Sequence, residues 1–261
     1  MNPFLLILRH RRILFQTTLS DIRARFAGSV LGLLWVVFYP LLLLGSYAFI
    51  YVKIFQLRFG MLEPYEYVAL IFCGLVPYIG FSEALGMGVS SVVANSKLIK
   101  NTLFPIELIP VKAVLVSQCT QFSGTGLLLV ALVVLGKLSP WAVLLPVIWL
   151  SQILFSIGLI WILSSLNVYF RDLQNIVPVI SIMLLFVTPI AYTPDLIPAV
   201  YRPFLKINPL YFFVRAYQDS LMLDTFPTEW SLIVSIALGM VFFLVGFWFF
   251  SKMKRVFADN V

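Results

Sequence analysis

The sequence has little charge. Only 11% of its 261 residues are Asp, Glu, Lys or Arg, whereas 61% are hydrophobic. Soluble domains carry about 25% charged residues, so most of this chain has no polar face to offer water. The apolar runs continue over about 18 residues or more, which is typical of membrane-spanning helices and differs from the alternating pattern of barrel strands. The fold class expected is an all-α integral membrane protein.

Histidine and cysteine are also scarce. His10 is the one histidine in the sequence, so neither serine–histidine catalysis nor a histidine-ligated metal site is expected. Cys73 and Cys119 both fall inside apolar runs, where neither a disulfide nor a cysteine-ligated metal site is expected. The sequence contains no G-x-x-x-x-G-K-[ST] motif for ATP and no acidic cluster suited to Mg²⁺. We therefore expect no enzyme activity and no cofactor in this chain.

Six apolar stretches predict six membrane-spanning helices within a single domain that covers residues 1–261. A helix rises about 1.5 Å per residue, so about 20 residues cross a hydrocarbon core of about 30 Å. The fifth stretch is short enough to end inside the bilayer. The expected spans are residues 30–52, 67–93, 111–135, 141–168, 176–190 and 230–250.

Residues 1–27 have the pattern of an amphipathic helix that lies on the membrane surface. At about 100° per residue, apolar side chains fall in one stripe, bordered by arginines that reach toward lipid phosphates. A plain basic arm that only fixes membrane topology is the alternative. The stripe consists of Leu8, Phe15, Leu19, Ile22 and Phe26, and its border of Arg9, Arg12 and Arg23.

Residues 95–105, between the second and third spans, have the pattern of a short helix outside the bilayer. Asn95 or Ser96 can cap its start, and Pro105 ends it. Such a helix suits docking to a partner protein, and a turn at the lipid surface is the alternative. Its apolar residues recur at helical spacing, opposite its two lysines, and these are Leu98, Ile99, Leu103 and Phe104, with Lys97 and Lys100.

Residues 191–229, between the fifth and sixth spans, are rich in proline and aromatic residues. A loop of this length generally has structure of its own. Its apolar clusters predict two short helices that rest in or on the outer leaflet of the membrane.

Two features inside the spans are too polar to face lipid. Glu83 lies in the second span, where it is either a functional residue or the acceptor of a packing hydrogen bond near a wet end. The first half of the third span carries hydrogen-bonding side chains that either join helices or line a wet passage. They are Ser117, Gln118, Thr120, Gln121, Ser123 and Thr125.

The positive charges favour one side of this topology. Most of the 18 Lys and Arg residues lie in the segments that share a side with the N-terminus. Because Lys and Arg concentrate in cytoplasmic loops, both termini and residues 95–105 are expected in the cytoplasm. The net charge of +7 is thus explained by topology and anionic lipids, and no contact with nucleic acid is expected.

A series of short motifs resembles a known family over nearly the whole chain. In this order and spacing they resemble the transmembrane (permease) subunit of bacterial ABC-2 type exporters of lipid-linked polysaccharides, namely O antigen, group 2 capsule or teichoic acid. The motifs are Asp21-Ile-Arg-x-Arg-Phe26 with Leu31-Gly-Leu-Leu-Trp35, Gly74-Leu-Val-Pro77, Asn95-Ser-Lys-Leu-Ile-Lys100 with Phe104-Pro105 and Pro110, Asn167-x-x-Phe-Arg-Asp172, Thr188-Pro189, and Asn208-Pro-Leu210.

The resemblance implies the ABC-2 (type V-like) exporter fold, with six transmembrane helices, an N-terminal interface helix, a cytoplasmic coupling helix and short external gate helices. It implies a homodimer of permeases in the bacterial cytoplasmic (inner) membrane, worked by two separate cytoplasmic ATPase subunits that bind ATP and Mg²⁺. The implied function is export of a polyprenyl-pyrophosphate-linked polysaccharide, foremost O antigen, to the periplasm.

The resemblance also assigns roles to residues of this chain. Coupling to the ATPase is expected from Asn95, Ser96, Lys97, Leu98, Ile99, Lys100, Asn101, Phe104 and Pro105. Arg23, Arg25, Arg171 and Asp172 are expected at the cytoplasmic entrance, where we hypothesise that arginines meet the lipid pyrophosphate. The channel lining is expected to include Trp35, Tyr39, Tyr78 and Glu83, and the external gate Tyr192, Pro194, Asn208 and Pro209.

Three alternatives remain open from the sequence. One is an ABC-2 exporter of another substrate, such as capsule, teichoic acid, a small lipid or a drug. Another is a membrane enzyme of lipid-linked glycan assembly, against which the missing acidic cluster argues. The third is a non-catalytic membrane scaffold for such an assembly.

Overall fold

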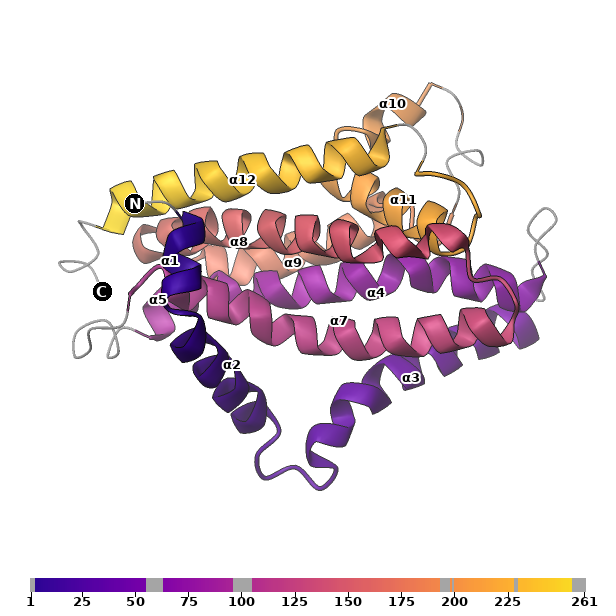
Figure 1. The fold of residues 1–261 in the computed structure, drawn as a ribbon, viewed down its shortest axis with the longest axis horizontal. Helices are drawn as coiled ribbons and strands as arrows, with labels where there is room; N and C mark the ends of the chain where they lie inside the picture. The colour runs from indigo at the N-terminus through magenta and orange to yellow at the C-terminus, as the bar shows by residue number, and fades with distance from the viewer. Residues whose placement is uncertain are drawn as a thin grey trace.

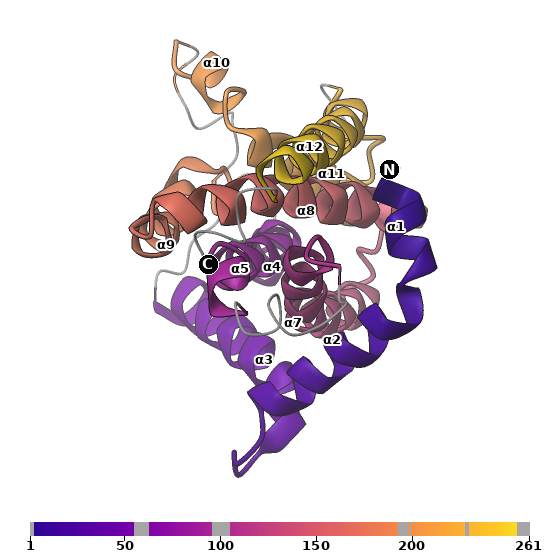
Figure 2. The ribbon, with the colours of Figure 1, turned by 90° about the vertical axis from the view of Figure 1, so that its left-hand side faces the viewer.

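The computed structural model describes residues 3–54, 63–95, 105–192, 198, 200–227 and 230–254. Within these ranges the chain is a bundle of helices that run along one long axis (Figure 1). Its long helices are α4 (Pro64–Gly88), α7 (Leu108–Val134), α8 (Leu145–Tyr169) and α12 (Ser231–Met253). The helix α4 lies inside the bundle, surrounded by its neighbours when the molecule is viewed from one end (Figure 2).

Five helical stretches in the described ranges are long and apolar enough to cross a membrane. The expected span at residues 176–190 corresponds to α9 (Leu173–Val187), which has 15 residues. At about 1.5 Å per residue it is about 22 Å long, which is less than the thickness of a hydrocarbon core. The five stretches are Gly32–Ile54, Pro64–Gly88, Leu108–Val134, Pro140–Tyr169 and Ser231–Met253.

The first of these stretches is continuous but not uniform. A 3₁₀ turn, η1 (Gly32–Leu34), leads into α3 (Trp35–Ala48), which passes into a π-helical segment, η2 (Phe49–Ile54). The helix α3 runs obliquely to the long axis of the bundle (Figure 1) and contacts α4 and α7, beginning with Val36, whose carbonyl oxygen accepts from Ser123 of α7. Much of its apolar surface is exposed in this single chain.

The closest packing in the bundle is between α8 and α12. An added Cβ at Gly158 would overlap the carbonyl oxygen of Phe242, and one at Gly246 would overlap the carbonyl oxygen of Gly158. Small residues allow helix backbones to approach in this way inside a membrane, where dispersion contacts replace the hydrophobic effect as the driving force. The sequence reading did not identify this pair of helices.

The N-terminal segment differs from the single amphipathic helix expected over residues 1–27. It forms α1 (Pro3–Arg9) and α2 (Arg11–Arg25), which are separated at His10. Leu14 is buried in the contact with the bundle, whereas Leu8 and Phe15 of the expected stripe are exposed. The orientation of α2 is set in part by an ion pair of 2.8 Å between Asp21 and Lys112 of α7.

The second expected external helix is not on a surface. After the single turn of α10 (Arg202–Leu205), the chain forms α11 (Pro209–Leu221), which packs against α4, α8 and α12. Almost every residue from Leu210 to Leu221 is buried, so α11 is part of the bundle, a packing that the sequence did not predict. Polar side chains of α11 form hydrogen bonds inside the bundle, so their polar groups do not require contact with water.

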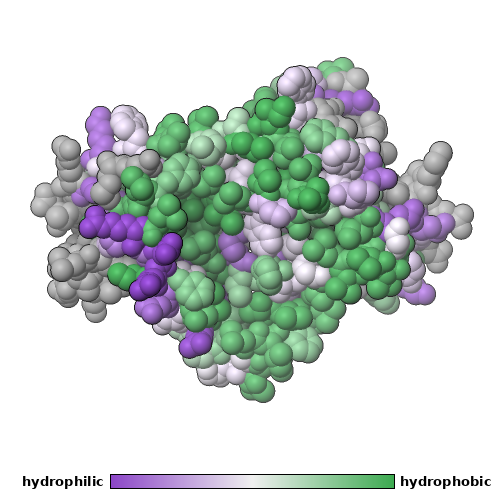
Figure 3. Space-filling view, viewed as in Figure 1, coloured by the Kyte–Doolittle hydropathy of each residue, from purple (hydrophilic) through white to green (hydrophobic). Residues whose placement is uncertain are grey.

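The two ends of the bundle carry different segments. Both termini and α5 (Ser91–Ala94) lie at one end, and α10 with the turn that precedes η3 (Pro140–Leu144) lies at the other (Figure 1). A broad hydrophobic band covers the middle of the face in Figure 3, and hydrophilic side chains gather over the end that carries α1 and α2. This distribution matches a protein that crosses a membrane along its long axis.

Candidate functional site

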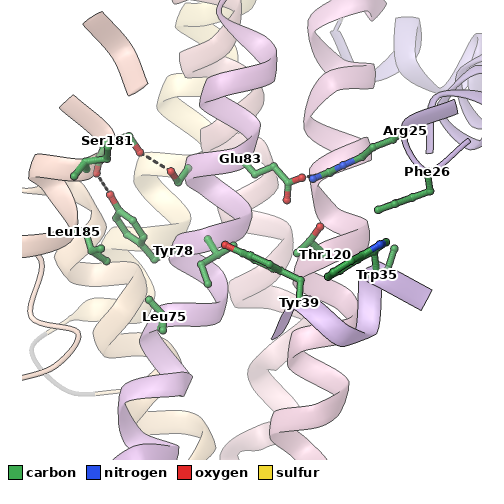
Figure 4. Close-up of a pocket in the computed structure, with 14 residues that line it drawn as sticks. Arg25, Phe26, Trp35, Tyr39, Leu75, Tyr78, Glu83, Thr120, Ser181 and Leu185 are labelled. Carbon is green, nitrogen blue, oxygen red and sulfur yellow. Dashed lines mark hydrogen bonds and ion pairs between the residues drawn. The ribbon is translucent and has the colours of Figure 1, made fainter. Parts of the chain in front are cut away.

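A cavity of about 550 Å³ lies where α2, α3, α4, α7 and α9 meet (Figure 4). It brings together five residues that the sequence analysis singled out from separate segments, one expected at the entrance and four in the channel lining. These are Arg25, Trp35, Tyr39, Tyr78 and Glu83, and they share the cavity wall with Phe26, Val36, Leu75, Ile79, Ser82, Thr120, Ser181, Ile182 and Leu185.

Arg25 and Glu83 form an ion pair in this cavity. Arg25 is the last residue of α2, where a positive charge is favoured by the helix dipole, and Glu83 lies in the second half of α4. The Glu83 side chain is 14% exposed and that of Arg25 is 39% exposed. A carboxylate at this depth is costly unless it is paired, and Arg25 is the partner that makes it tolerable.

Aromatic rings form much of the remaining wall. Trp35 and Tyr39 are one helical turn apart on α3, and Figure 4 shows both rings on the same side of the Arg25–Glu83 pair. Tyr78 projects from α4, and its hydroxyl donates to the carbonyl oxygen of Ser181 on α9. Tyr78 is therefore held in place, whereas Trp35 and Tyr39 are partly exposed and available to a ligand.

The contact between α4 and α9 is reinforced beside Tyr78. The Ser181 hydroxyl donates to the hydroxyl oxygen of Ser82 over 2.7 Å. Both serines line the cavity. This pair supplies polar groups to a wall that is otherwise mostly apolar.

The other residues expected at the entrance do not line this cavity. Arg171 and Asp172 are exposed in the turn between α8 and α9, and Arg23 is exposed on α2. In the described ranges, no three His, Cys, Asp or Glu residues gather as a metal site would require. The described cavity therefore combines one cation–carboxylate pair with aromatic rings and hydroxyl groups.

The polar residues in the first half of α7 mainly join helices. Gln121 donates to the side-chain oxygen of Gln152 over 3.1 Å, and the Tyr217 hydroxyl donates to the same oxygen over 2.7 Å. The amide of Gln152 also donates to the carbonyl oxygen of Pro77 over 2.8 Å. This network ties α4, α7, α8 and α11 together at the centre of the bundle, and Thr120 alone among the six expected residues appears in the cavity wall.

The sequence did not reveal the partners in this network, because they lie in other spans. Trp149 of α8 donates its ring N–H to Gln118 over 2.6 Å, and Ser123 donates to the carbonyl oxygen of Val36 over 2.6 Å. Polar residues at a similar depth in two spans were the available signal for these partners. Inside a membrane, such side chains satisfy one another's hydrogen-bonding groups.

Two of the expected gate residues act together at the start of α11. Asn208 caps this helix by accepting from the backbone N–H of Leu210 over 3.0 Å, and Pro209 occupies the first helical position. The Asn208 amide also donates to the Thr188 hydroxyl over 2.8 Å, which fastens α11 to the end of α9. Both roles make Asn208 a junction between two elements.

Tyr192 lies beside the end of α9. Its hydroxyl donates to the carbonyl oxygen of Val187 over 2.9 Å. Burial raises the pKa of Tyr192 above its ordinary value. Pro194, the fourth residue expected in the gate, lies outside the described residues.

Most of the expected coupling segment lies outside the described residues, namely Ser96, Lys97, Leu98, Ile99, Lys100, Asn101 and Phe104. Asn95 ends α5, and its amide donates to the carbonyl oxygen of Ser91 over 2.8 Å. Pro105 leads into the first turn before α7. There Glu107 pairs with Lys254, a contact that the sequence reading missed.

Comparisons with known proteins agree on one family. The family model described as "ABC-2 type transporter" matches residues 14–222. The chain is 32% identical over 249 residues to the O-antigen export system permease protein RfbA of Klebsiella pneumoniae, covering 95% of this chain and 94% of that protein. It is 28% identical over 256 residues to the protein of the same name from Myxococcus xanthus, covering 97% and 96% of the two chains.

A more distant similarity covers less of the chain. The polysialic acid transport protein KpsM of Escherichia coli is 26% identical over 219 residues, which are 78% of this chain and 79% of that protein. The family match spans most of the sequence and includes the segments that build the cavity between α2, α3, α4, α7 and α9. The chain therefore belongs to the family of ABC-2 type transporters.

Proposed function

We propose that this chain is the permease subunit of an ATP-driven exporter that moves a polyprenyl-pyrophosphate-linked polysaccharide from the cytoplasm to the periplasm. Membership of a transporter family supports transport rather than enzymatic glycan assembly. The relatives named for O-antigen export are more similar to this chain than the relative named for polysialic acid transport, which favours O antigen as the substrate.

The observation that carries the proposal is the composition of the cavity. Arg25 supplies a planar set of donors that suits phosphate, and Trp35 and Tyr39 supply ring faces that pack against the apolar faces of sugars. At about 550 Å³ the cavity accommodates a lipid head group with its first sugars but not a polymer. We therefore assign it to the entrance, where the lipid-linked end of the substrate is received.

The passage for the polymer is completed by a second copy of the chain in this proposal. The apolar side of α3 that continues from the cavity is exposed over Val37, Phe38, Leu41 and Leu42. A homodimer would cover such a face and place two entrance cavities beside a shared path.

ATP enters the mechanism through a separate subunit. Both termini and the two sides of the expected coupling segment lie at one end of the bundle, which we assign to the cytoplasm (Figure 1). Two ATPase subunits would bind ATP and Mg²⁺ and dock on residues 95–105. Their closure would move the helices around the dimer axis and admit the substrate, and hydrolysis would reset the gate.

Reconstitution tests the proposed function directly. Vesicles would contain the chain, its ATPase partner and the lipid-linked polysaccharide, and ATP-dependent transfer of polysaccharide across the membrane would be measured. The double variant Arg23→Glu/Arg25→Glu should assemble with the ATPase but lose export, because it repels the pyrophosphate. Arg25→Lys should lose part of the export, since an ammonium group lacks the planar donor set.

The matched control is Arg11→Glu, which reverses a charge at the opposite end of α2 and away from the cavity. It should leave export close to that of the wild type. Normal export and normal stimulation of the ATPase in the Arg23→Glu/Arg25→Glu variant would refute the assignment of the entrance.

A further inference from the structure

The anion-binding group of the cavity is already occupied by a group of the same chain. Arg25 pairs with the carboxylate of Glu83, and the pair joins the end of α2 to α4. The nearby lining is mostly apolar, with Phe26, Trp35 and Ile79 among its residues. An anion that takes the place of the carboxylate at Arg25 must therefore displace Glu83.

An unpaired Arg25 would face a specific problem in a membrane. Every phospholipid carries a phosphodiester, and at a membrane surface these groups are present at very high local concentration. A guanidinium in a cavity of low polarity would bind them by charge-assisted hydrogen bonds. The cavity would then be filled with bulk lipid instead of the substrate.

We infer that Glu83 is an internal competitor that sets an affinity threshold at Arg25, so that single phosphodiesters do not occupy the cavity while a diphosphate does. This inference rests on the proposed function and adds a specificity-determining residue to it. The carboxylate reduces the fraction of time for which Arg25 is free, and this lowers the apparent affinity for every anion by the same factor.

An equal reduction of the apparent affinity for every anion still separates two ligands when one of them, the phosphodiester of bulk lipid, is abundant but binds weakly. A single phosphodiester gives Arg25 about the same charge that Glu83 already provides, so the exchange gains little. A diphosphate brings two negative charges and more acceptor oxygens, and the hydroxyl groups of Ser82 and Thr120 line the same cavity. Bulk lipid thus falls below the threshold and the diphosphate stays above it.

The displaced carboxylate also has a route to water. The Glu83 side chain is 14% exposed in the paired state, so a change of rotamer toward the open side of the cavity can rehydrate it. The exchange therefore does not require the carboxylate to remain unpaired in an apolar environment, which would be prohibitive.

The test uses the full-length chain in lipid nanodiscs and a radiolabelled probe, farnesyl diphosphate esterified to N-acetylglucosamine. Binding is measured in phosphatidylcholine alone, where the choline group offsets the charge of the phosphodiester, and with increasing phosphatidylglycerol, whose phosphodiester carries an uncompensated negative charge. For the wild type, we expect an affinity that is nearly independent of phosphatidylglycerol. Glu83→Gln should bind the probe about tenfold more tightly in phosphatidylcholine, because the charged competitor is gone.

Phosphatidylglycerol should weaken probe binding to Glu83→Gln several-fold, because the uncovered Arg25 now accepts bulk lipid. Asp224→Asn is the control, since it removes one negative charge near the other end of the bundle and keeps an acceptor for the Ser139 hydroxyl. It should behave as the wild type. Thermal unfolding of each variant verifies that the fold is intact.

The outcomes separate the inference from the proposed function. Loss of probe binding in Arg25→Gln, with binding in the wild type, supports the proposed site. If Glu83→Gln then shows neither tighter binding nor sensitivity to phosphatidylglycerol, Glu83 is not a competitor and the inference is overturned alone. If the wild type does not bind the probe, or if Arg25→Gln binds it equally well, both the site and the inference fail.

Discussion

Glu107 and Lys254 form an ion pair although they are 147 residues apart in the sequence. Glu107 directly precedes α7 and is 4% exposed, and Lys254 is the residue that ends α12. The backbone carbonyl of Glu107 also accepts a hydrogen bond of 2.9 Å from the ring N–H of Trp161 on α8. The chain that leaves residues 95–105 is thus fastened to two helices at once.

This contact predicts a separable effect on coupling. Glu107→Gln removes the charge that pairs with Lys254 but keeps the shape of the side chain. We expect a loss of about 1–2 kcal/mol in the free energy of unfolding, since the pair is only partly shielded from solvent. We also expect fewer polysaccharides exported per ATP hydrolysed, because the proposed docking segment would no longer move together with α12.

Glu66→Gln is the matched control for Glu107→Gln. Glu66 pairs with Lys137 over 3.0 Å at the other end of the bundle, away from the proposed ATPase. It should cost a comparable amount of stability and leave the ratio of export to ATP hydrolysis unchanged. An unchanged ratio in Glu107→Gln as well would show that the pair with Lys254 is structural only.

The contact between α8 and α12 predicts strong sensitivity to a single methyl group. In Gly246→Ala the new Cβ would overlap the carbonyl oxygen of Gly158, and neither backbone can move without separating the helices. We expect a loss of about 1–3 kcal/mol in the free energy of unfolding, as for other overpacked sites. Thermal unfolding in detergent and the yield of folded protein would measure it.

Gly126→Ala provides the comparison for Gly246→Ala. Gly126 lies within α7, and an added Cβ there meets no atom within 4 Å. Because alanine favours a helix over glycine by up to about 1 kcal/mol, this variant should be as stable as the wild type or slightly more stable. Equal stability of Gly246→Ala and Gly126→Ala would contradict the close approach of α8 and α12.

The sequence predicted individual residues of the cavity better than their relationships. Glu83 was singled out because a charge inside an apolar span demands an explanation, and Arg25 because the resemblance implied a place at the cytoplasmic entrance. Their pairing was not predicted, because 58 residues separate them and no local pattern links them. Trp35 and Tyr39 were identified by resemblance and by position, and only the structure brings them beside Tyr78.

The burial of α11 was missed for a different reason. Its apolar cluster predicted a helix, and the long segment around it, rich in proline and aromatic residues, favoured a place in or on the outer leaflet. The Tyr217 hydroxyl in fact donates a hydrogen bond to Gln152, and Gln218 donates to the carbonyl oxygens of Leu70 and Ile190. Whether a polar residue faces water or a distant partner depends on tertiary contacts, which a single sequence does not display.

The contact of α8 with α12 left a signal that was available. Ser151 and Gly158 are seven residues apart on α8, and Gly239 and Gly246 have the same spacing on α12. Small residues at this interval place a continuous groove along one side of each helix. Ser117 and Gly124 have the same spacing on α7, so the interval indicates close helix packing without identifying which two helices meet.

Asn208 predicts a graded response at the end of the bundle that carries α10. Asn208→Ala removes both the cap of α11 and the bond to Thr188, and it should cost about 1–2 kcal/mol in the free energy of unfolding. Asn208→Asp keeps an acceptor for the N–H of Leu210 but loses the donor to Thr188, so it should cost less. Hydrogen exchange at residues 210–213 should increase most in the alanine variant, and equal exchange in both variants would exclude the capping role.

Trp35 predicts a loss of export without a loss of assembly. It is 38% exposed in the cavity wall, so its ring contributes contact area to a ligand more than to the core. Trp35→Ala should lower the export rate about three- to tenfold, because one ring contact is worth about 0.5–1.5 kcal/mol. Trp35→Phe should retain most of the rate, since a ring face remains.

Trp248→Ala is the control, because Trp248 is also exposed but lies on α12 and away from the cavity. An equal decrease in Trp248→Ala would indicate a general effect of lost aromatic surface in the membrane, and an unchanged rate in Trp35→Ala would remove Trp35 from the substrate path.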